Sequence, residues 1–154
     1  MQIDGIANND VSGTIYGIEI SATWSPIDWW KLRGWYSHCE DDYDYSGDGE
    51  NLFESAYGHI TPRHQFFLRS SFDMPYNTEL DILGRYVSQL PGLDISDYVT
   101  MDLRLGWRPQ EHLEISLVGR NLLEHRHQES STNLIYGSAG ALQRSVFLRL
   151  QVDF

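Results

Sequence analysis

The last ten residues of the chain, 145–154, restrict its fold more than any other stretch of the sequence. Every second residue is apolar, and the residues between them are polar except Phe147. The apolar residues are Val146, Leu148, Leu150, Val152 and Phe154. A period of two predicts a β-strand with one apolar and one polar face. A soluble domain usually ends on a frayed, polar segment. A strand that continues to the last residue and ends on an aromatic side chain therefore argues against a soluble domain.

The same alternation recurs along the whole chain. The predicted strands span about 13–24, 29–38, 63–74, 78–88, 98–107, 112–121 and 143–154. Short turns containing Pro26, Pro75 and Pro109 alternate with long connections over about 39–62, 89–97 and 122–142. Strands of about ten residues with short turns at one end and long loops at the other are typical of outer-membrane β-barrels. We predict an all-β fold, an antiparallel up-and-down meander of about seven strands.

The charged residues of these strands support a membrane location. Thirteen of them share one predicted face: Glu19, Lys31, Arg33, Arg69, Asp73, Asp81, Arg85, Asp102, Arg104, Glu114, Arg120, Arg149 and Asp153. An Arg or Lys at the centre of the lipid face would cost about 2–4 kcal/mol, so this face is predicted to line the lumen. There, opposite charges on neighbouring strands can pair. Trp24, Trp30 and Trp107 lie near the short turns, where an interfacial aromatic girdle is expected.

The composition excludes several other classes of protein. No run of about 18 apolar residues exists, so no transmembrane helix is predicted. The net charge of -11 argues against binding to nucleic acid, which needs a basic surface. The single cysteine, Cys39, excludes an internal disulfide. Residues 1–4 have neither the basic start nor the apolar core of a signal peptide, so an outer-membrane protein with this sequence is expected to lack its beginning here.

No motif predicts an enzyme, a cofactor or a metal site. The sequence has no phosphate-binding glycine loop, no HExxH and no nucleophile elbow. His125 and His127 lie beside Glu124 and Glu129, but alternating histidines on a polar loop are interpreted as solvated rather than metal-binding. The acidic residues between Glu40 and Glu54 are interpreted as a solvated loop, with a cation or basic-ligand site as the alternative.

Aromatic and histidine side chains in the longest connection are the candidate ligand contacts. They are Tyr43, Tyr45 and Tyr57 within the acidic segment, with His59 and His64 at its return to a strand. A connection of this length in a compact fold is usually functional or mobile. Aromatic rings there can stack on a ligand, and the alternative is that they pack on each other.

Two adjacent strands and the turn between them resemble the end of a known family. The segments 98–109, YVTMDLRLGWRP, and 113–123, LEISLVGRNLL, followed by a loop and a last strand ending in Phe154, resemble the C-terminal part of TonB-dependent outer-membrane receptors. The segments 13–19 and 24–26 are similar to its barrel repeats. The resemblance implies a Gram-negative outer membrane, a barrel of 22 strands and a plug that TonB contacts. It also implies uptake of a scarce nutrient, typically a ferric siderophore and in other members cobalamin or carbohydrate.

The resemblance places this chain, 1–154, as a C-terminal segment of that transmembrane barrel, with the plug absent. The implied partners are outer-membrane lipid, the remaining strands, the plug, TonB through that plug, and the barrel-assembly machinery. The last strand, with Phe154, Val152 and Leu150, carries the family's assembly signal. Seven strands would leave two open edges, which are costly in lipid, so the segment alone is not expected to transport.

Two alternatives remain open from the sequence. A soluble β-sandwich that binds a ligand such as carbohydrate would also suit the aromatic content of 13%, and it would pack the apolar face on a second sheet. A small closed barrel of eight strands would need an additional strand within residues 1–12, which are polar and short.

Overall fold

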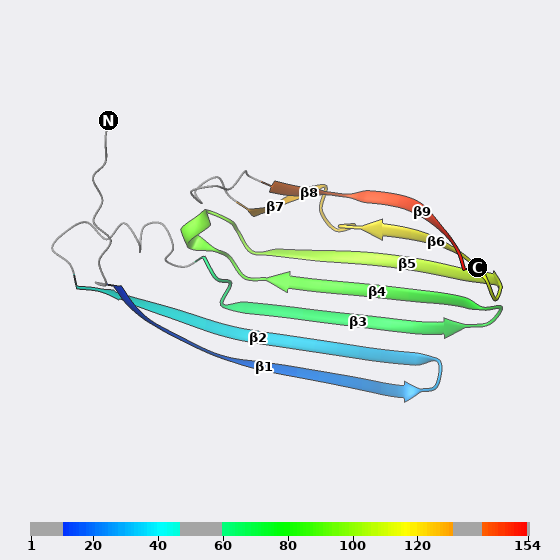
Figure 1. Cartoon of the computed structure of the whole chain (residues 1–154), viewed down its shortest axis with the longest axis horizontal. Coiled ribbons are helices and arrows are strands. Elements are labelled where there is room, and N and C mark those ends of the chain that lie inside the picture. The colour runs from blue at the N-terminus through cyan, green and yellow to red at the C-terminus, as the bar shows by residue number, and fades with distance from the viewer. Residues whose placement is uncertain (1–10, 47–59, 131–139, 154) are drawn as a thin grey trace.

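The computed structural model describes residues 11–46, 60–130 and 140–153. Seven strands form one antiparallel sheet in the order β1-β2-β3-β4-β5-β6-β9 (Figure 1). Their bounds are β1 Val11–Ile27, β2 Trp30–Tyr45, β3 His64–Met74, β4 Thr78–Val87, β5 Tyr98–Gln110, β6 Leu113–Arg120 and β9 Ser145–Val152. This confirms the predicted all-β meander of seven strands. The sheet is open, because within the described residues β1 and β9 each pair along one side only.

The first two strands are longer than the sequence predicted. The prediction ended the second strand at His38, but β2 continues through the acidic residues to Tyr45 and stays paired with β1 as far as Val11. Asp and Asn are depleted in strands, yet this preference depends on context, and the long partner strand supplies a complete hydrogen-bond ladder. The interpretation of Glu40, Asp41, Asp42 and Asp44 as part of a loop was therefore wrong.

The short turns lie together at one end of the sheet, and the strand ends that lead into the long connections lie at the other (Figure 1). Between β1 and β2 the register shifts from Trp24 to Ile27, because Pro26 has no N–H to donate to the ladder. Between β3 and β4, Tyr76 and Asn77 adopt φ values of 63° and 55°. The backbone N–H of Asp153 donates to the carbonyl of His112, which places the end of the described chain beside the short turns.

The polar segment 122–142 is not a simple loop. It contains β7 Arg126–Ser130 and part of β8 Gly140–Gln143, which pair as a separate antiparallel hairpin. The sequence missed this hairpin because its two strands are short and show no apolar alternation. A second unpredicted element, the 3-10 helix η1 Pro91–Leu93, lies between β4 and β5. Around it Val87, Leu90, Leu93, Ile95 and Tyr98 form a small buried cluster.

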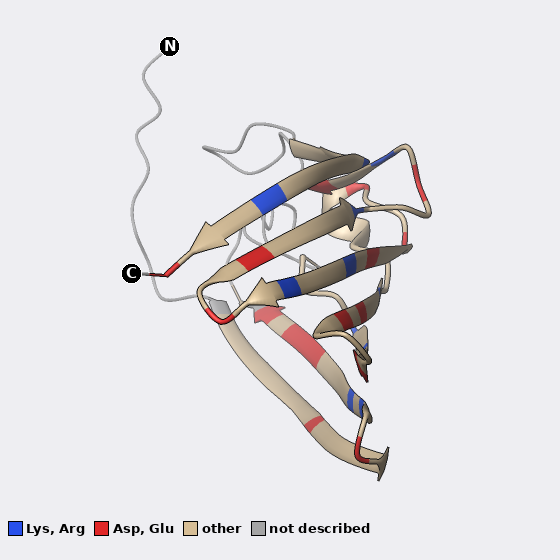
Figure 2. Cartoon of the chain, turned by 90° about the vertical axis from the view of Figure 1, so that its right-hand side faces the viewer, with Lys and Arg blue, Asp and Glu red and all other residues tan. Residues whose placement is uncertain are grey.

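The strand register places all the predicted lumen charges on one face. Residues paired across neighbouring strands point to the same side of the sheet. Ser71 of β3 pairs with Asp81 of β4, and Asp81 pairs with Arg104 of β5. The other face carries exposed apolar side chains, with Trp24 61%, Leu148 70% and Leu150 64% exposed. Viewed from the turn end, the strands follow an arc, and charged residues recur along it (Figure 2). No second sheet covers the apolar face in the described ranges, which does not favour the β-sandwich.

Aromatic rings gather on the apolar face near the short turns. The ring of Trp30 stacks on Phe72 at a centroid distance of 5.9 Å and lies 6.2 Å from Trp24. Its indole N–H donates a hydrogen bond of 2.9 Å to the Ser70 hydroxyl. An aromatic ring with one polar end suits the boundary between hydrocarbon and water. No helix in the described part of the chain has the length and apolar composition to cross a membrane.

Candidate functional site

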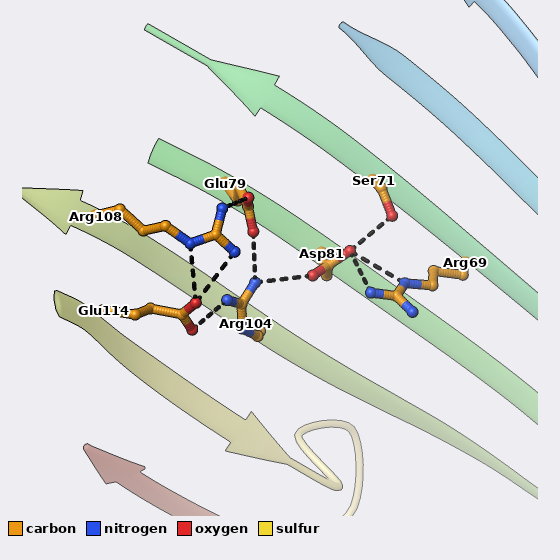
Figure 3. A network of polar contacts seen from close by, with 7 residues as sticks. All are labelled: Arg69, Ser71, Glu79, Asp81, Arg104, Arg108 and Glu114. Carbon is orange, nitrogen blue, oxygen red and sulfur yellow. Dashed lines mark hydrogen bonds and ion pairs between the residues drawn. The ribbon is translucent and has the colours of Figure 1, made fainter. Parts of the chain in front are cut away.

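A network of six charged side chains lies on the charged face near the short turns (Figure 3). Its members come from β3 to β6 and comprise Arg69, Glu79, Asp81, Arg104, Arg108 and Glu114, with the hydroxyl of Ser71. Alternation along each strand brings them to one face, and the antiparallel register sets them side by side. Three arginines meet three carboxylates, so the network is neutral. The predicted pairing of opposite charges across neighbouring strands is confirmed.

Asp81 is the most enclosed member of this network. Its side chain is 8% exposed, and its Oδ1 accepts hydrogen bonds from Arg69 Nη2 at 2.9 Å and from Ser71 Oγ at 2.6 Å. Its Oδ2 accepts from Arg104 Nη1 at 3.2 Å. Both carboxylate oxygens are therefore satisfied, as a buried charge requires. The arrangement stabilises the sheet and pairs each acid and base of this network.

A second cluster fixes the β7–β8 hairpin to the charged face at the opposite end. Glu129 of β7 pairs with the guanidinium of Arg85 on β4 and accepts a hydrogen bond of 3.0 Å from His127 Nε2. The ring of His127 stacks on Tyr98 at a centroid distance of 4.6 Å. The backbone carbonyl of Leu142 accepts a bond of 3.2 Å from the Asn121 side chain. Contacts from both strands thus hold the hairpin in place.

The interpretation of His127 as a solvated loop residue was wrong, because this side chain is buried. Residues 127 and 129 are two apart on a strand and therefore point to the same side. This two-residue spacing is visible in the sequence. It indicates a shared side only once residues 126–130 are known to form a strand. Within the described ranges, no group of three or more His, Cys, Asp or Glu side chains is placed to hold a metal ion.

The environment of Glu129 predicts that attachment of the hairpin depends on pH. Burial of Glu129 by itself raises the pKa of its carboxyl group, but the hydrogen bond from His127 and the charge of Arg85 outweigh it. The pKa of Glu129 therefore lies below its usual value of 4.5. A carboxyl group whose pKa is lowered by folding stabilises the folded form above its unfolded pKa. This stabilisation is lost as the pH falls through the lower, folded value.

We expect acidification below about pH 4.5 to loosen the hairpin before the main sheet. Amide hydrogen exchange of residues 126–130 and 140–143, corrected for the intrinsic rate at each pH, measures the loosening. In Glu129→Gln the side chain no longer titrates, so protection of the hairpin should be weaker at neutral pH and change little on acidification. A hairpin that loses protection equally in the native protein and in this variant would contradict the assigned role of Glu129.

The structure places the predicted ligand contacts at the end of the sheet with the long connections. Tyr43 lies in β2 with its ring across Gly13 of β1, where an added Cβ would come within 2.6 Å of that ring. Tyr45 ends β2, and only its backbone position is described. Tyr57 and His59 lie outside the described residues, as does Phe154.

His64 begins β3 and lies on the apolar face. Its Nδ1 is 2.9 Å from the Tyr36 hydroxyl, and its ring stacks on His38 at 4.8 Å. His64 also borders a cavity of about 550 Å³ that includes Asp41 and Asp97. The structure therefore brings His64 near the acidic end of β2, on the side of β3 that also carries Phe66 and Leu68.

An open, arc-shaped sheet with one exposed apolar face and one face of paired charges defines a segment of a transmembrane β-barrel wall. The family model of the TonB dependent receptor-like β-barrel matches residues 4–122. The chain belongs to this family of TonB-dependent receptors. A search of curated protein sequences gave no match.

Solved structures with the same fold include two receptors. The structure of the FpvAI–pyocin S2 complex superposes with a TM-score of 0.71 at 16% identity, over 94% of this chain and 20% of that one. The ferric yersiniabactin uptake receptor FyuA from Yersinia pestis gives a TM-score of 0.72 at 20% identity, over 95% of this chain and 24% of that one. The present chain thus spans about a quarter or less of either structure.

Proposed function

We propose that the chain forms part of the wall of an outer-membrane receptor that takes up a scarce nutrient, such as a ferric siderophore, into a Gram-negative bacterium. The observation that carries this proposal is the division of the sheet into two faces. Exposed Leu148 and Leu150 suit contact with lipid, while the neutral network around Asp81 suits a polar lumen. The fold shared with a ferric yersiniabactin receptor supports the class of cargo.

The rest of the receptor supplies the remaining parts of this function. Residues 1–154 act as the C-terminal barrel segment, and further strands pair with the unpaired edges of β1 and β9. A plug fills the lumen and couples uptake to TonB. The seven strands do not transport by themselves, because unpaired strand edges are costly in lipid. The segment has no enzymatic role in this proposal, since the paired arginines and carboxylates leave no activated group.

Two sets of residues have assigned tasks in this proposal. Phe154, Val152 and Leu150 are recognised by the barrel-assembly machinery; Val152 and Leu150 lie in the last strand, β9, on the lipid face. Tyr43, Tyr45, Tyr57, His59 and His64 contact the cargo at the end of the barrel where the long connections begin. Both assignments are predictions from the sequence.

Uptake in a defined host tests the proposed function. The gene product, expressed from its full reading frame in a Gram-negative strain without its own siderophore receptors, is supplied with a panel of radioactive ferric siderophores. We expect the protein in the outer-membrane fraction and accumulation of iron from at least one siderophore, which deletion of TonB abolishes. Recovery in the soluble fraction, or uptake that persists without TonB, would contradict the proposal.

A further inference from the structure

A cavity of about 470 Å³ lies between the β7–β8 hairpin and the charged face of the main sheet. Its volume falls within the range of about 300–1,000 Å³ typical of small-molecule sites. Phe67 and Leu83 of the sheet and Leu142 of the hairpin give it an apolar part. The cavity is therefore suited to a molecule with both an apolar body and polar groups.

One cation in this cavity has no acidic partner. Arg85 is paired with Glu129, but Arg120 makes no ion pair in the described part of the chain. The guanidinium of Arg120 instead lies 5.4 Å from the centre of the Phe147 ring. Phe147, the apolar exception on the polar face of β9, thus has a charged neighbour on that face. An arginine held by an aromatic ring keeps its planar fork of donors available for a carboxylate or another oxyanion.

Two residues that line the same cavity, Asn121 and His127, each have a buried acceptor atom. In a neutral His127 ring that donates from Nε2 to Glu129, Nδ1 is an acceptor. This Nδ1 and Asn121 Oδ1 are buried and form no hydrogen bond with any described residue. A buried acceptor without a donor is costly, and a ligand hydroxyl group would satisfy it. The cavity thus combines an unpaired cation with acceptors that need donors.

We propose that this cavity binds an organic hydroxy acid: Arg120 binds its oxyanion, while Asn121 and His127 accept hydrogen bonds from its hydroxyl groups. The identification of this acid as part of the transported cargo rests on the proposed function. The proposed site itself does not depend on that function, because it is inferred from the side chains that line the cavity.

Three related probes separate the features that the site recognises. Hydroxynaphthoate carries an oxyanion and a hydroxyl group, naphthoate lacks the hydroxyl, and naphthol lacks the oxyanion. Titration calorimetry of the gene product from its full reading frame, in detergent, measures binding of each. We expect hydroxynaphthoate to bind most tightly and naphthol most weakly. Equal affinities for hydroxynaphthoate and naphthol would overturn the anion site, and equal affinities for hydroxynaphthoate and naphthoate would overturn the hydroxyl contacts.

Variants assign the site to this cavity. Loss of a charge-assisted hydrogen bond weakens binding by about tenfold or more, which is the effect expected for hydroxynaphthoate in Arg120→Gln. Arg149→Gln is the matched control. Arg149 is an exposed arginine of β9 on the charged face; it contacts Gln151 and does not line the cavity. Equal weakening in Arg120→Gln and Arg149→Gln would overturn the assignment.

Uptake and binding distinguish failure of the two proposals. If hydroxynaphthoate binds through Arg120 but no ferric siderophore is taken up, the hydroxy-acid site stands and the proposed function fails. If uptake occurs and Arg120→Gln changes neither uptake nor binding of hydroxynaphthoate, the receptor function stands and this site is wrong.

Discussion

Replacing Leu103 with arginine is expected to block assembly of the protein in the outer membrane. Leu103 lies near the middle of β5 on the apolar face, where it pairs with Ile82 on one side and Gly119 on the other. An arginine at the midplane of a lipid-facing strand costs about 2–4 kcal/mol. No carboxylate shares this face with Leu103 on the directly paired positions, so the new charge would have no partner there.

Leu83→Arg is the matched control, because it makes the same substitution on the other face. Leu83 pairs directly with Asp102 and Arg69 on the charged face and borders the cavity beneath the hairpin. A new guanidinium there can reach Asp102 and polar surroundings, so its cost should be much smaller. Heat-modifiable electrophoretic mobility of the outer-membrane fraction measures assembly of both variants. Equal assembly of the two would contradict the assignment of lipid and lumen faces.

The faces could be predicted from sequence because they depend only on a local rule. Side chains alternate along every strand, and short proline-containing turns fix which strands are neighbours. The charges of Arg69, Asp81 and Arg104 therefore had to share a face once the strands were identified. The sequence could not give their partners, since the relative shift of neighbouring strands decides which carboxylate each arginine reaches.

The hairpin and the end of β2 could not be predicted because distant contacts determine them. Residues 126–130 have no apolar period, and they are ordered by pairing with 140–143 and by Arg85 and Tyr98 of the sheet. The acidic residues of β2 similarly form a strand only because β1 continues beside them. The buried position of His127 follows from the hairpin, so the cavity could not be found from sequence alone.

Asp81→Ala is expected to be the most destabilising change within the polar network. Removal of one partner from a buried ion pair typically costs about 3–5 kcal/mol. Arg69 is 44% and Arg104 26% exposed, so water can partly solvate the guanidinium groups that lose Asp81. We therefore expect a lower cost of about 2–3 kcal/mol, measured as the free energy of unfolding by urea in detergent or lipid.

Two further variants test whether the stability contributed by Asp81 comes from the burial of its charge or only from its membership of the ion-pair network. Asp81→Asn keeps an acceptor for Ser71 and the arginines, so it should lose less stability than Asp81→Ala. Arg108→Gln removes contacts to Glu79 and Glu114 at a position that is 49% exposed, where an ion pair contributes only about 0–1 kcal/mol. If Arg108→Gln were as destabilising as Asp81→Ala, enclosure of Asp81 would not be the source of the effect. The expected loss of stability instead decreases as the exposure of the replaced side chain increases. The network therefore stabilises the barrel wall mainly through Asp81, whose enclosed carboxylate has little access to water that could replace its arginine partners.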